Sequence, residues 1–246
     1  MAIEVFNRYE NKYIMDIHTY VKIQNIINKH MYSDENSKKN SFYTICNIYY
    51  DTCNNELIRK SISKPKYKEK LRLRGYGVPS LEDKVYLEIK KKVNGLVNKR
   101  RTSLKLKEAY NFIETKKKPK IQDYMNKQVL NEIEYFLNLY CLEPKIYISY
   151  DRKAFFCNEN RDLRITFDSN ITTRRYKLGL NYGNYGMKLL NKNIILMEIK
   201  AENNIPIWVS KMLSNHKLYK SSFSKYGTVY KNSLQNPQYE EVSNNA

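Results

Sequence analysis

The stretch Lys68-Glu-Lys-Leu-Arg-Leu-Arg-Gly75 carries a cation at every second position. Side chains of a β-strand alternate between its two faces, so one face would hold Lys68, Lys70, Arg72 and Arg74, and the other Leu71 and Leu73. Cations in a row repel one another, and a chain of phosphates is the counter-charge that suits lysine and arginine best. The stretch therefore predicts a strand with one apolar face and one anion-binding face.

The whole chain is strongly basic. Its 246 residues include 44 Lys and Arg against 25 Asp and Glu, which gives a formal net charge of +19. Such an excess indicates a polyanionic partner, whether nucleic acid, an anionic membrane or a phosphorylated molecule or polymer. A compositional bias toward Lys, Asn, Ile and Tyr explains the total about equally well, so the placement of the charges carries more weight than their sum.

Cysteine and histidine usage argues against a zinc site. The four cysteines form no C-x-x-C pair, and the three histidines lie far apart in the sequence. The N-terminus lacks the basic and apolar regions of a signal peptide, and no apolar run approaches the roughly 18 residues that span a membrane. These features predict a cytoplasmic protein with free thiols, and a location at the inner face of a membrane stays open.

The chain alternates between strand-like and helix-like segments. Strand periodicity appears at 5–14, 42–50, 67–76, 84–92, 96–104, 145–155, 162–168 and 193–201. Helical periodicity appears at 16–31, 52–62, 105–113, 123–140 and 206–218. We therefore expect one α+β domain over residues 1–234, built on a mainly antiparallel sheet, and a polar, flexible tail over 235–246.

Three of the predicted strands place an acid and a base side by side on one face: Glu10/Lys12, Glu88/Lys90 and Glu198/Lys200. A half-exposed sheet with one wet face would explain these charges. A closed β-barrel tunnel of about eight strands, charged inside and covered by peripheral helices outside, explains them better, because the opposite faces are strongly apolar. For single residues simpler explanations remain. Glu88 and Lys99 could be ordinary surface charges, and Asp168 could have no role beyond neutralising Arg174 or Arg175.

A triphosphate would suit such a tunnel. Its oxygens accept bidentate hydrogen bonds from Arg and single contacts from Lys, which offsets both the burial and the mutual repulsion of the cations. Carboxylates among the cations suit a divalent metal that bridges phosphate oxygens, since Mg²⁺ and Mn²⁺ prefer hard oxygen ligands.

Nine motifs in sequence order resemble one known family. They are Arg8-Tyr-Glu-Asn-Lys-Tyr13, Tyr49-Tyr-Asp51, Lys70-Leu-Arg-Leu-Arg-Gly-Tyr76, Leu87-Glu-Ile-Lys90, Lys99-Arg-Arg101, Tyr150-Asp-Arg-Lys-Ala-Phe155, Leu163-Arg-Ile-Thr-Phe-Asp168, Met197-Glu-Ile-Lys200 and Ser222-Phe-Ser-Lys-Tyr-Gly227. Together they resemble the catalytic domain of the vacuolar transporter chaperone complex, a triphosphate tunnel metalloenzyme, in its free-standing prokaryotic form. Any one motif is weak, but nine in order are specific.

The resemblance implies a polyphosphate polymerase that transfers the terminal phosphate of ATP onto a growing polyphosphate chain, with Mn²⁺ or Mg²⁺. By motif it implies catalytic roles for Lys12, Arg72, Arg74, Lys90, Arg152, Arg164 and Lys225, a substrate contact from Lys99 and the metal ligand Glu198. To these we add, from their places on the charged strand faces, Lys200 as a further catalytic residue, Lys70 and Arg101 as substrate contacts and Glu10 as a second metal ligand. Its partners would be ATP, polyphosphate and, in the complex, a separate membrane-embedded subunit.

One departure bears on the reaction. The hydrolytic branch of the superfamily opens with E-x-E-x-K, whereas this chain has Arg8-x-Glu10-x-Lys12, which favours the polymerase branch. Three alternatives stay open: a tunnel triphosphatase, a non-catalytic binder of polyphosphate or inositol phosphates, and a nucleic-acid-binding protein. The interleaved carboxylates argue against the last, because they would repel a nucleic-acid backbone.

Overall fold

A computed structural model describes residues 9–34, 37, 41–94, 96–158, 162–202 and 204–235. Its strands are β1 (Tyr9–Asp16), β2 (Met31–Ser33), β3 (Tyr43–Thr52), β4 (Tyr67–Tyr76), β5 (Lys84–Val93), β6 (Leu96–Lys105), β7 (Leu142–Cys157), β8 (Arg164–Arg174), β9 (Met187–Lys188) and β10 (Ile194–Ala201). Its helices are α1 (Ile17–His30), α2 (Glu56–Ile62), α3 (Leu106–Thr115), α4 (Lys127–Leu139), α5 (Ile207–Asn215) and α6 (Lys225–Gln235). Within these ranges no helix is long and apolar enough to cross a membrane.

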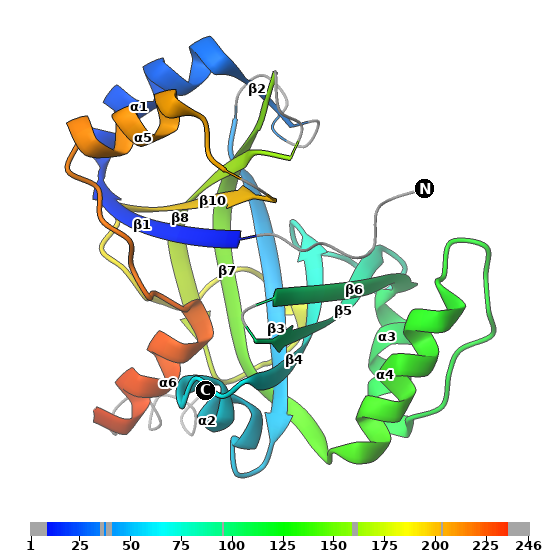
Figure 1. Ribbon diagram of the computed structural model, residues 1–246. Coiled ribbons are helices and arrows are strands. Elements are labelled where there is room, and N and C mark those ends of the chain that lie inside the picture. The colour runs from blue at the N-terminus through cyan, green and yellow to red at the C-terminus, as the bar shows by residue number, and fades with distance from the viewer. Residues whose placement is uncertain are drawn as a thin grey trace.

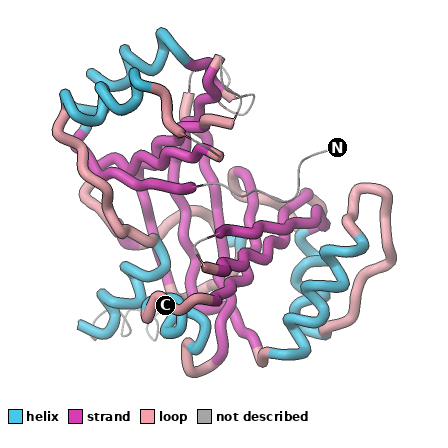
Figure 2. The backbone as a smooth tube through the Cα atoms, in the orientation of Figure 1, coloured by secondary structure: helices cyan, strands magenta, loops and turns pink. Residues whose placement is uncertain are grey.

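All main strands join one antiparallel sheet, which confirms the α+β class. The order is β1-β10-β8-β7-β3-β4-β5-β6, with short β2 and β9 beside β7 and β8. In Figures 1 and 2 the long strands β3, β7 and β8 form a wall, and the pairs β1/β10 and β5/β6 curl forward from its two sides. We call the inner side of this curl the concave face.

The expectation of a closed barrel is wrong. β1 and β6 end the strand order, and no pairing joins them in the part of the chain that the structure describes. The outer edge of β1 has another partner, because the Ser221 backbone N–H donates to the Lys12 carbonyl at 2.7 Å. The connection from α5 to α6 therefore occupies the edge that closure would need.

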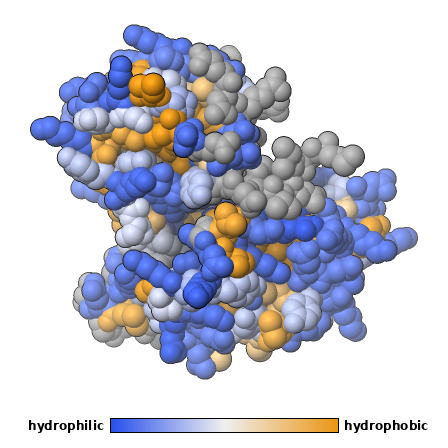
Figure 3. Space-filling view, in the orientation of Figure 1, coloured by the Kyte–Doolittle hydropathy of each residue, from blue (hydrophilic) through white to orange (hydrophobic). Residues whose placement is uncertain are grey.

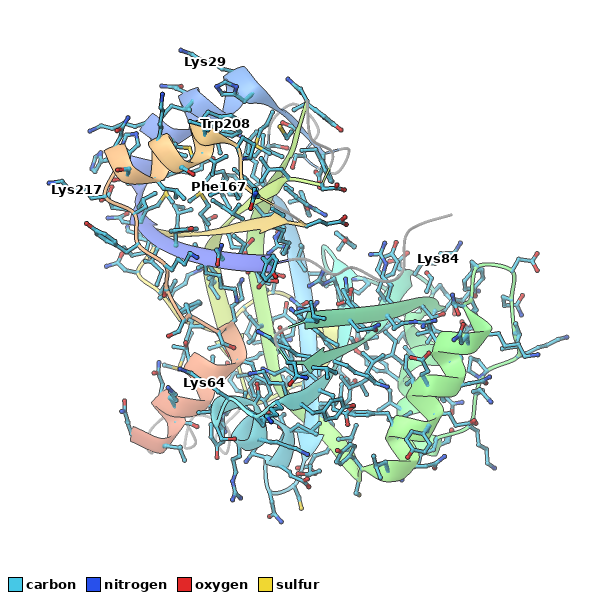
Figure 4. The ribbon with its side chains drawn as sticks, viewed as in Figure 1. Lys29, Lys64, Lys84, Phe167, Trp208 and Lys217 are labelled. Carbon is cyan, nitrogen blue, oxygen red and sulfur yellow. The ribbon has the colours of Figure 1, made fainter. Side chains whose placement is uncertain are left out.

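Two apolar clusters cover the convex side of the sheet. Leu71 and Leu73 pack under α3 and α4, as the alternation in the opening stretch predicts. Phe167 and its neighbours pack under α1 and α5, and Figure 4 shows Phe167 on that side. Both leucines and Phe167 are fully buried. Burial on this side forces the alternate side chains of each strand onto the concave face.

A third apolar cluster lies on the concave face itself, where only charges were expected. Helix α6, which the sequence patterns did not predict, packs Tyr226 and Val229 against Ile45, Ile148 and Leu196. The charged surface therefore occupies only part of the concave face, and α6 covers the rest.

Three predicted segments either differ from the elements described or reach beyond them. The first strand begins at Tyr9 in the structure, and residues 5–8 of the prediction lie outside the described part. The strand predicted over 162–168 spans Arg164–Arg174 and contains an irregularity where it pairs with β7. Of the predicted tail, Gln235 ends α6, and 236–246 lie outside the described residues.

Candidate functional site

The basic residues singled out from the sequence meet on the concave face. They come from many strands and one helix: Lys12 on β1, Lys200 on β10, Arg164 on β8, Arg152 on β7, Lys70, Arg72 and Arg74 on β4, Lys90 on β5, Lys99 and Arg101 on β6, and Lys225 at the start of α6. Cross-strand pairing sets several of these side by side, as in Lys200 opposite Arg164 and Lys90 opposite Lys99. Like charges so placed need anions between them.

Glu88 is the anion at the centre of one cluster. Its Oε2 accepts from the Arg72 Nε and Nη2 at 2.9 and 2.5 Å, and its Oε1 lies 2.6 Å from the Lys99 Nζ. The Nε of Arg74 lies 3.7 Å from the Glu88 Oε2. Only 1% of Glu88 is exposed, so the idea that it is an ordinary surface charge is wrong. The same holds for Lys99, because it is half-buried and pairs with this buried carboxylate. Glu88 holds three cations in fixed positions.

Asp168 and Glu198 form the second cluster. Arg152 binds both oxygens of Asp168 at 2.6 and 2.7 Å and reaches Glu198 at 3.4 Å. Lys225 lies 2.5 Å from Asp168 and 3.5 Å from Glu198, and Lys200 lies 3.2 Å from Glu198. The Arg152–Asp168 pair has the short, bidentate geometry of a strong charge-assisted interaction.

The suggestion that Asp168 merely neutralises Arg174 or Arg175 is wrong. Arg174 donates to the backbone carbonyls of Lys177, Gly179, Gly183 and Tyr185 and so organises the loop after β8. Arg175 donates to Ser233 of α6. Asp168 instead belongs to the charged cluster, because it shares the concave face of β8 with Arg164.

Glu10 and Lys12 extend the second cluster to Lys90, on the other side of the curl. Lys90 Nζ lies 3.5 Å from Glu10 Oε2, and Lys12 Nζ lies 3.4 Å from Glu10 and 3.9 Å from Glu198. Lys12 also donates to the Phe223 carbonyl at 3.1 Å. A continuous chain of alternating charges thus crosses the concave face from β1 to β5.

The carboxylates of the site are ionised at neutral pH. Burial alone would raise the pKa of Glu198, but the cations led by Lys200 and Lys225 hold it well below its usual range. Burial also opposes ionisation of Glu10, yet Lys90 and its other cationic neighbours bring the pKa of Glu10 to about 2. Both groups are therefore available as anionic oxygen ligands.

Burial lowers the pKa of three lysines of the site. Burial lowers the pKa of Lys99 to about 7 in spite of the Glu88 carboxylate, because Arg74 and Arg72 lie close by. Burial and nearby lysines lower the pKa of Lys70 to about 8, and burial lowers the pKa of Lys200 as well. A bound polyanion would favour the charged form of each.

Some polar partners of these cations were not picked out as site residues. Tyr49 accepts from Arg72 Nη1 at 3.0 Å, Asn47 accepts from Arg74 Nε at 3.1 Å, and Asp34 accepts from Arg164 Nη2 at 3.3 Å. Asn47 and Tyr49 stand opposite Arg74 and Arg72 in the β3–β4 pairing. Once those two strands were taken as neighbours, alternation alone could have placed both.

The donor set fits a divalent metal only in part. Glu10 and Glu198 lie on paired strands and offer hard oxygen ligands. Among the described residues, however, no group of three or more His, Cys, Asp or Glu is placed to hold a metal ion. The protein alone would leave such an ion undersaturated. The site fits a metal that takes its other ligands from phosphate oxygens and water, as Mg²⁺ commonly does.

Comparison with solved structures finds the same fold. A putative adenylate cyclase of Bacillus halodurans superposes with a TM-score of 0.54 at 14% identity, over 90% of this chain and 96% of that one. One from Vibrio parahaemolyticus gives 0.46 at 12%, over 93% and 98%. A putative adenylyl cyclase of Hippeastrum, described as having a dominant triphosphatase activity, gives 0.47 at 15%, over 88% and 92%. At these identities the likeness concerns the fold alone.

The sequence comparisons concern the family. Curated proteins gave no match. The family model described as the VTC domain matches residues 7–234, which include every motif in the series from Lys12 to Lys225. This match covers nearly the whole chain and confirms the resemblance drawn from the motifs: the chain belongs to the VTC domain family.

Proposed function

We propose that the concave face binds a chain of phosphates and that the protein is a polyphosphate polymerase using ATP. One observation carries the proposal. The cations on this face outnumber the carboxylates Glu10, Glu88, Asp168 and Glu198, each of which already contacts two or more of them. The excess positive charge is partly buried, and a polyphosphate would offset it.

The residues would act by position and charge. Arg72, Arg74, Arg152 and Arg164 would bind phosphate oxygens, while Lys12, Lys90 and Lys200 would spread positive potential along the chain. The terminal oxygen of polyphosphate is already ionised, so it can attack the γ-phosphorus of ATP without a general base. A new P–O bond forms, the bond from the γ-phosphorus to the β,γ-bridging oxygen breaks, and ADP leaves with that electron pair. No proton has to move.

Glu198 and Glu10 are the proposed ligands of a divalent metal, Mn²⁺ or Mg²⁺. Such an ion, when bound, offsets charge on the phosphate oxygens. The residues' own contribution is to stay ionised: their cationic neighbours keep both carboxylates charged at neutral pH. Phosphates that draw Lys200 and Lys225 away from Glu198 would free its oxygens for the metal.

Hydrolysis of a triphosphate is the second candidate. It is favoured by the same two ionised carboxylates, Glu10 and Glu198, which would hold a divalent metal whose charge would make a water more acidic and more nucleophilic. The two reactions share the binding face and differ only in the nucleophile. A protein that binds the anion without turnover is the remaining outcome.

Incubation of the purified protein with ATP and Mn²⁺ separates these cases. Polymer detected on a stained gel supports the polymerase; phosphate release without polymer supports the triphosphatase; tripolyphosphate binding without either supports a binder. Glu198→Gln should abolish metal-dependent turnover while Glu82→Gln, a control at an exposed ion pair, keeps it. Full turnover by a folded Glu198→Gln protein would overturn the assignment of Glu198.

A further inference from the structure

Thr166 lies at the centre of the charged surface and has no assigned role. It stands on β8 between Arg164 and Asp168, whose side chains share its face. Across the sheet it pairs with Glu198 on one side and Ala154 on the other. Its exposed fraction is 0%. The side chain is thus enclosed by groups that belong to the proposed phosphate site.

The Thr166 hydroxyl is an orphan. Within the described residues it has no hydrogen-bond partner, although it is fully buried. Buried hydroxyls nearly always have one. Two other threonines of β8 obey this rule: Thr172 donates to the Asn170 carbonyl and Thr173 to the Tyr147 carbonyl, each at 3.1 Å. A hydroxyl left unpaired among so many polar groups indicates a partner that arrives with a ligand.

A second unpaired donor lies on the same face. The Nε of Arg164, two residues before Thr166, is also buried without a hydrogen-bond partner in the described part of the chain. Ala154, which is opposite Thr166, adds only a methyl group on that side. Residues two apart on one face of a strand have Cα atoms about 7 Å apart, so both donors lie within reach of one bound phosphate chain.

The neighbouring carboxylate does not supply the missing partner. The contacts that Glu198 makes go to Lys12, Arg152, Lys200 and Lys225. Phosphate oxygens that take over some of these cations would loosen the ion pairs of Glu198, the residue opposite Thr166 in the β8–β10 pairing. The long side chains of these ion pairs can rotate, whereas Thr166 itself is fixed by the strand.

We infer that the Thr166 hydroxyl donates a hydrogen bond to an oxygen of the bound phosphate chain, next to the guanidinium of Arg164. The inference rests on the proposed phosphate-binding function and adds a neutral donor to a site otherwise described by charges. It makes Thr166 a substrate-contacting residue.

The test compares three variants by calorimetric titration with inorganic tripolyphosphate in EDTA, and by thermal unfolding. Thr166→Val keeps the shape and removes the hydroxyl, so its affinity should fall about tenfold or more, while the ligand-free protein melts at the same or a higher temperature. Thr166→Ser keeps the donor and should bind nearly as the parent does. Thr173→Val is the matched control: it should melt lower and bind unchanged.

Each possible result of this test supports or overturns a specific claim. If the parent fails to bind tripolyphosphate, the proposed function fails. If the parent binds and Thr166→Val binds equally well, only the inference about Thr166 fails. A loss that appears with Mn²⁺ but not in EDTA would also overturn it, since the hydroxyl would then serve water on the metal. A lower melting temperature with unchanged affinity would show a structural hydroxyl instead.

Discussion

Glu10 and Lys90 lie 3.5 Å apart although their strands, β1 and β5, stand near opposite ends of the strand order. No backbone pairing in the described residues joins these two sides of the sheet. Side-chain charges therefore approach one another where the backbone leaves the curl open. In Figure 3 hydrophilic residues cover much of this face, with apolar residues gathered where α1 and α5 lie.

Glu10 should make the fold sensitive to acid. Its pKa is depressed from 4.5 to about 2, so its stabilising contribution is present above about pH 4.5 and is lost as the pH falls toward 2. Glu10→Gln should therefore unfold with a shallower dependence on pH in this window. Thermal unfolding from pH 7 to pH 2 measures it. At pH 7 Glu10→Gln should lower the free energy of unfolding by less than about 1 kcal/mol, since Lys90 is half exposed and solvent screens its pair with Glu10. Identical profiles would contradict the role of this pair.

Glu88→Gln should be far more costly. Removing one partner of a buried ion pair typically costs about 3–5 kcal/mol, because the other charges stay buried without compensation. Here Arg72, Arg74 and Lys99 would all lose their shared anion. Urea unfolding measures the loss, and the exposed control Glu82→Gln should change stability by less than about 0.5 kcal/mol.

The same variant has a second signature. Because a polyphosphate can replace the missing negative charge, tripolyphosphate should raise the melting temperature of Glu88→Gln more than that of the parent. An equal rise in both proteins would show that Glu88 and the ligand do not share these cations.

The sequence predicted the strands well because burial on one side imposes strict alternation. Leu71 and Leu73 settled the orientation of β4, and the orientation of its cations followed. Closure was not predictable, since it depends on which backbone takes the edge of β1, and Ser221 lies in a connection without periodicity. Helix α6 was not predicted for a related reason. Gly227 and polar residues weaken its helical periodicity, and its burial comes from tertiary contacts with Ile45 and Leu196.

For the site, local patterns identified cations but not their pairing. That Asp168 binds Arg152 and not Arg174 follows from the antiparallel match of β7 and β8, in which Arg152 stands opposite Asp168. From the sequence Glu88 could also be an ordinary surface charge, because nothing near it in the chain shows that it is buried. Its cation partners come from β4 and β6, at separations that no local motif encodes.

Tripolyphosphate binding should weaken as the pH rises from 6 to 9. Lys99 has a pKa of about 7 and Lys70 of about 8 in the free protein, and a bound polyanion raises both by favouring the charged forms. Binding near pH 8 therefore takes up protons. In Lys99→Arg the side chain stays charged at every pH in this range, so the affinity for tripolyphosphate should depend less on pH near 7. Near pH 8 the dependence should remain, because Lys70 is unchanged.

Calorimetry in buffers of different ionisation enthalpy measures this uptake directly. The titration of tripolyphosphate itself is common to parent and variant and cancels in the comparison. Lys29→Arg, on the exposed side of α1, serves as the control and should leave the profile unchanged. Equal proton uptake by the parent and Lys99→Arg would exclude Lys99 as the titrating group.

Asp168 should couple helix α6 to the sheet. It binds Arg152 of β7 and, at 2.5 Å, Lys225 at the first position of α6. Asp168→Asn leaves Arg152 and Lys225 with only their longer contacts to Glu198, at 3.4 and 3.5 Å, and should cost about 3–5 kcal/mol. Lys225→Met leaves Asp168 paired with Arg152 and should cost less. In the double variant Arg152 is the one cation that has lost Asp168, so the two losses should fall short of additivity by about 0.5–3 kcal/mol in urea unfolding. Strict additivity would mean that Lys225 and Asp168 stabilise the protein independently, and that the apolar contacts of Tyr226 and Val229 alone hold α6 against the concave face.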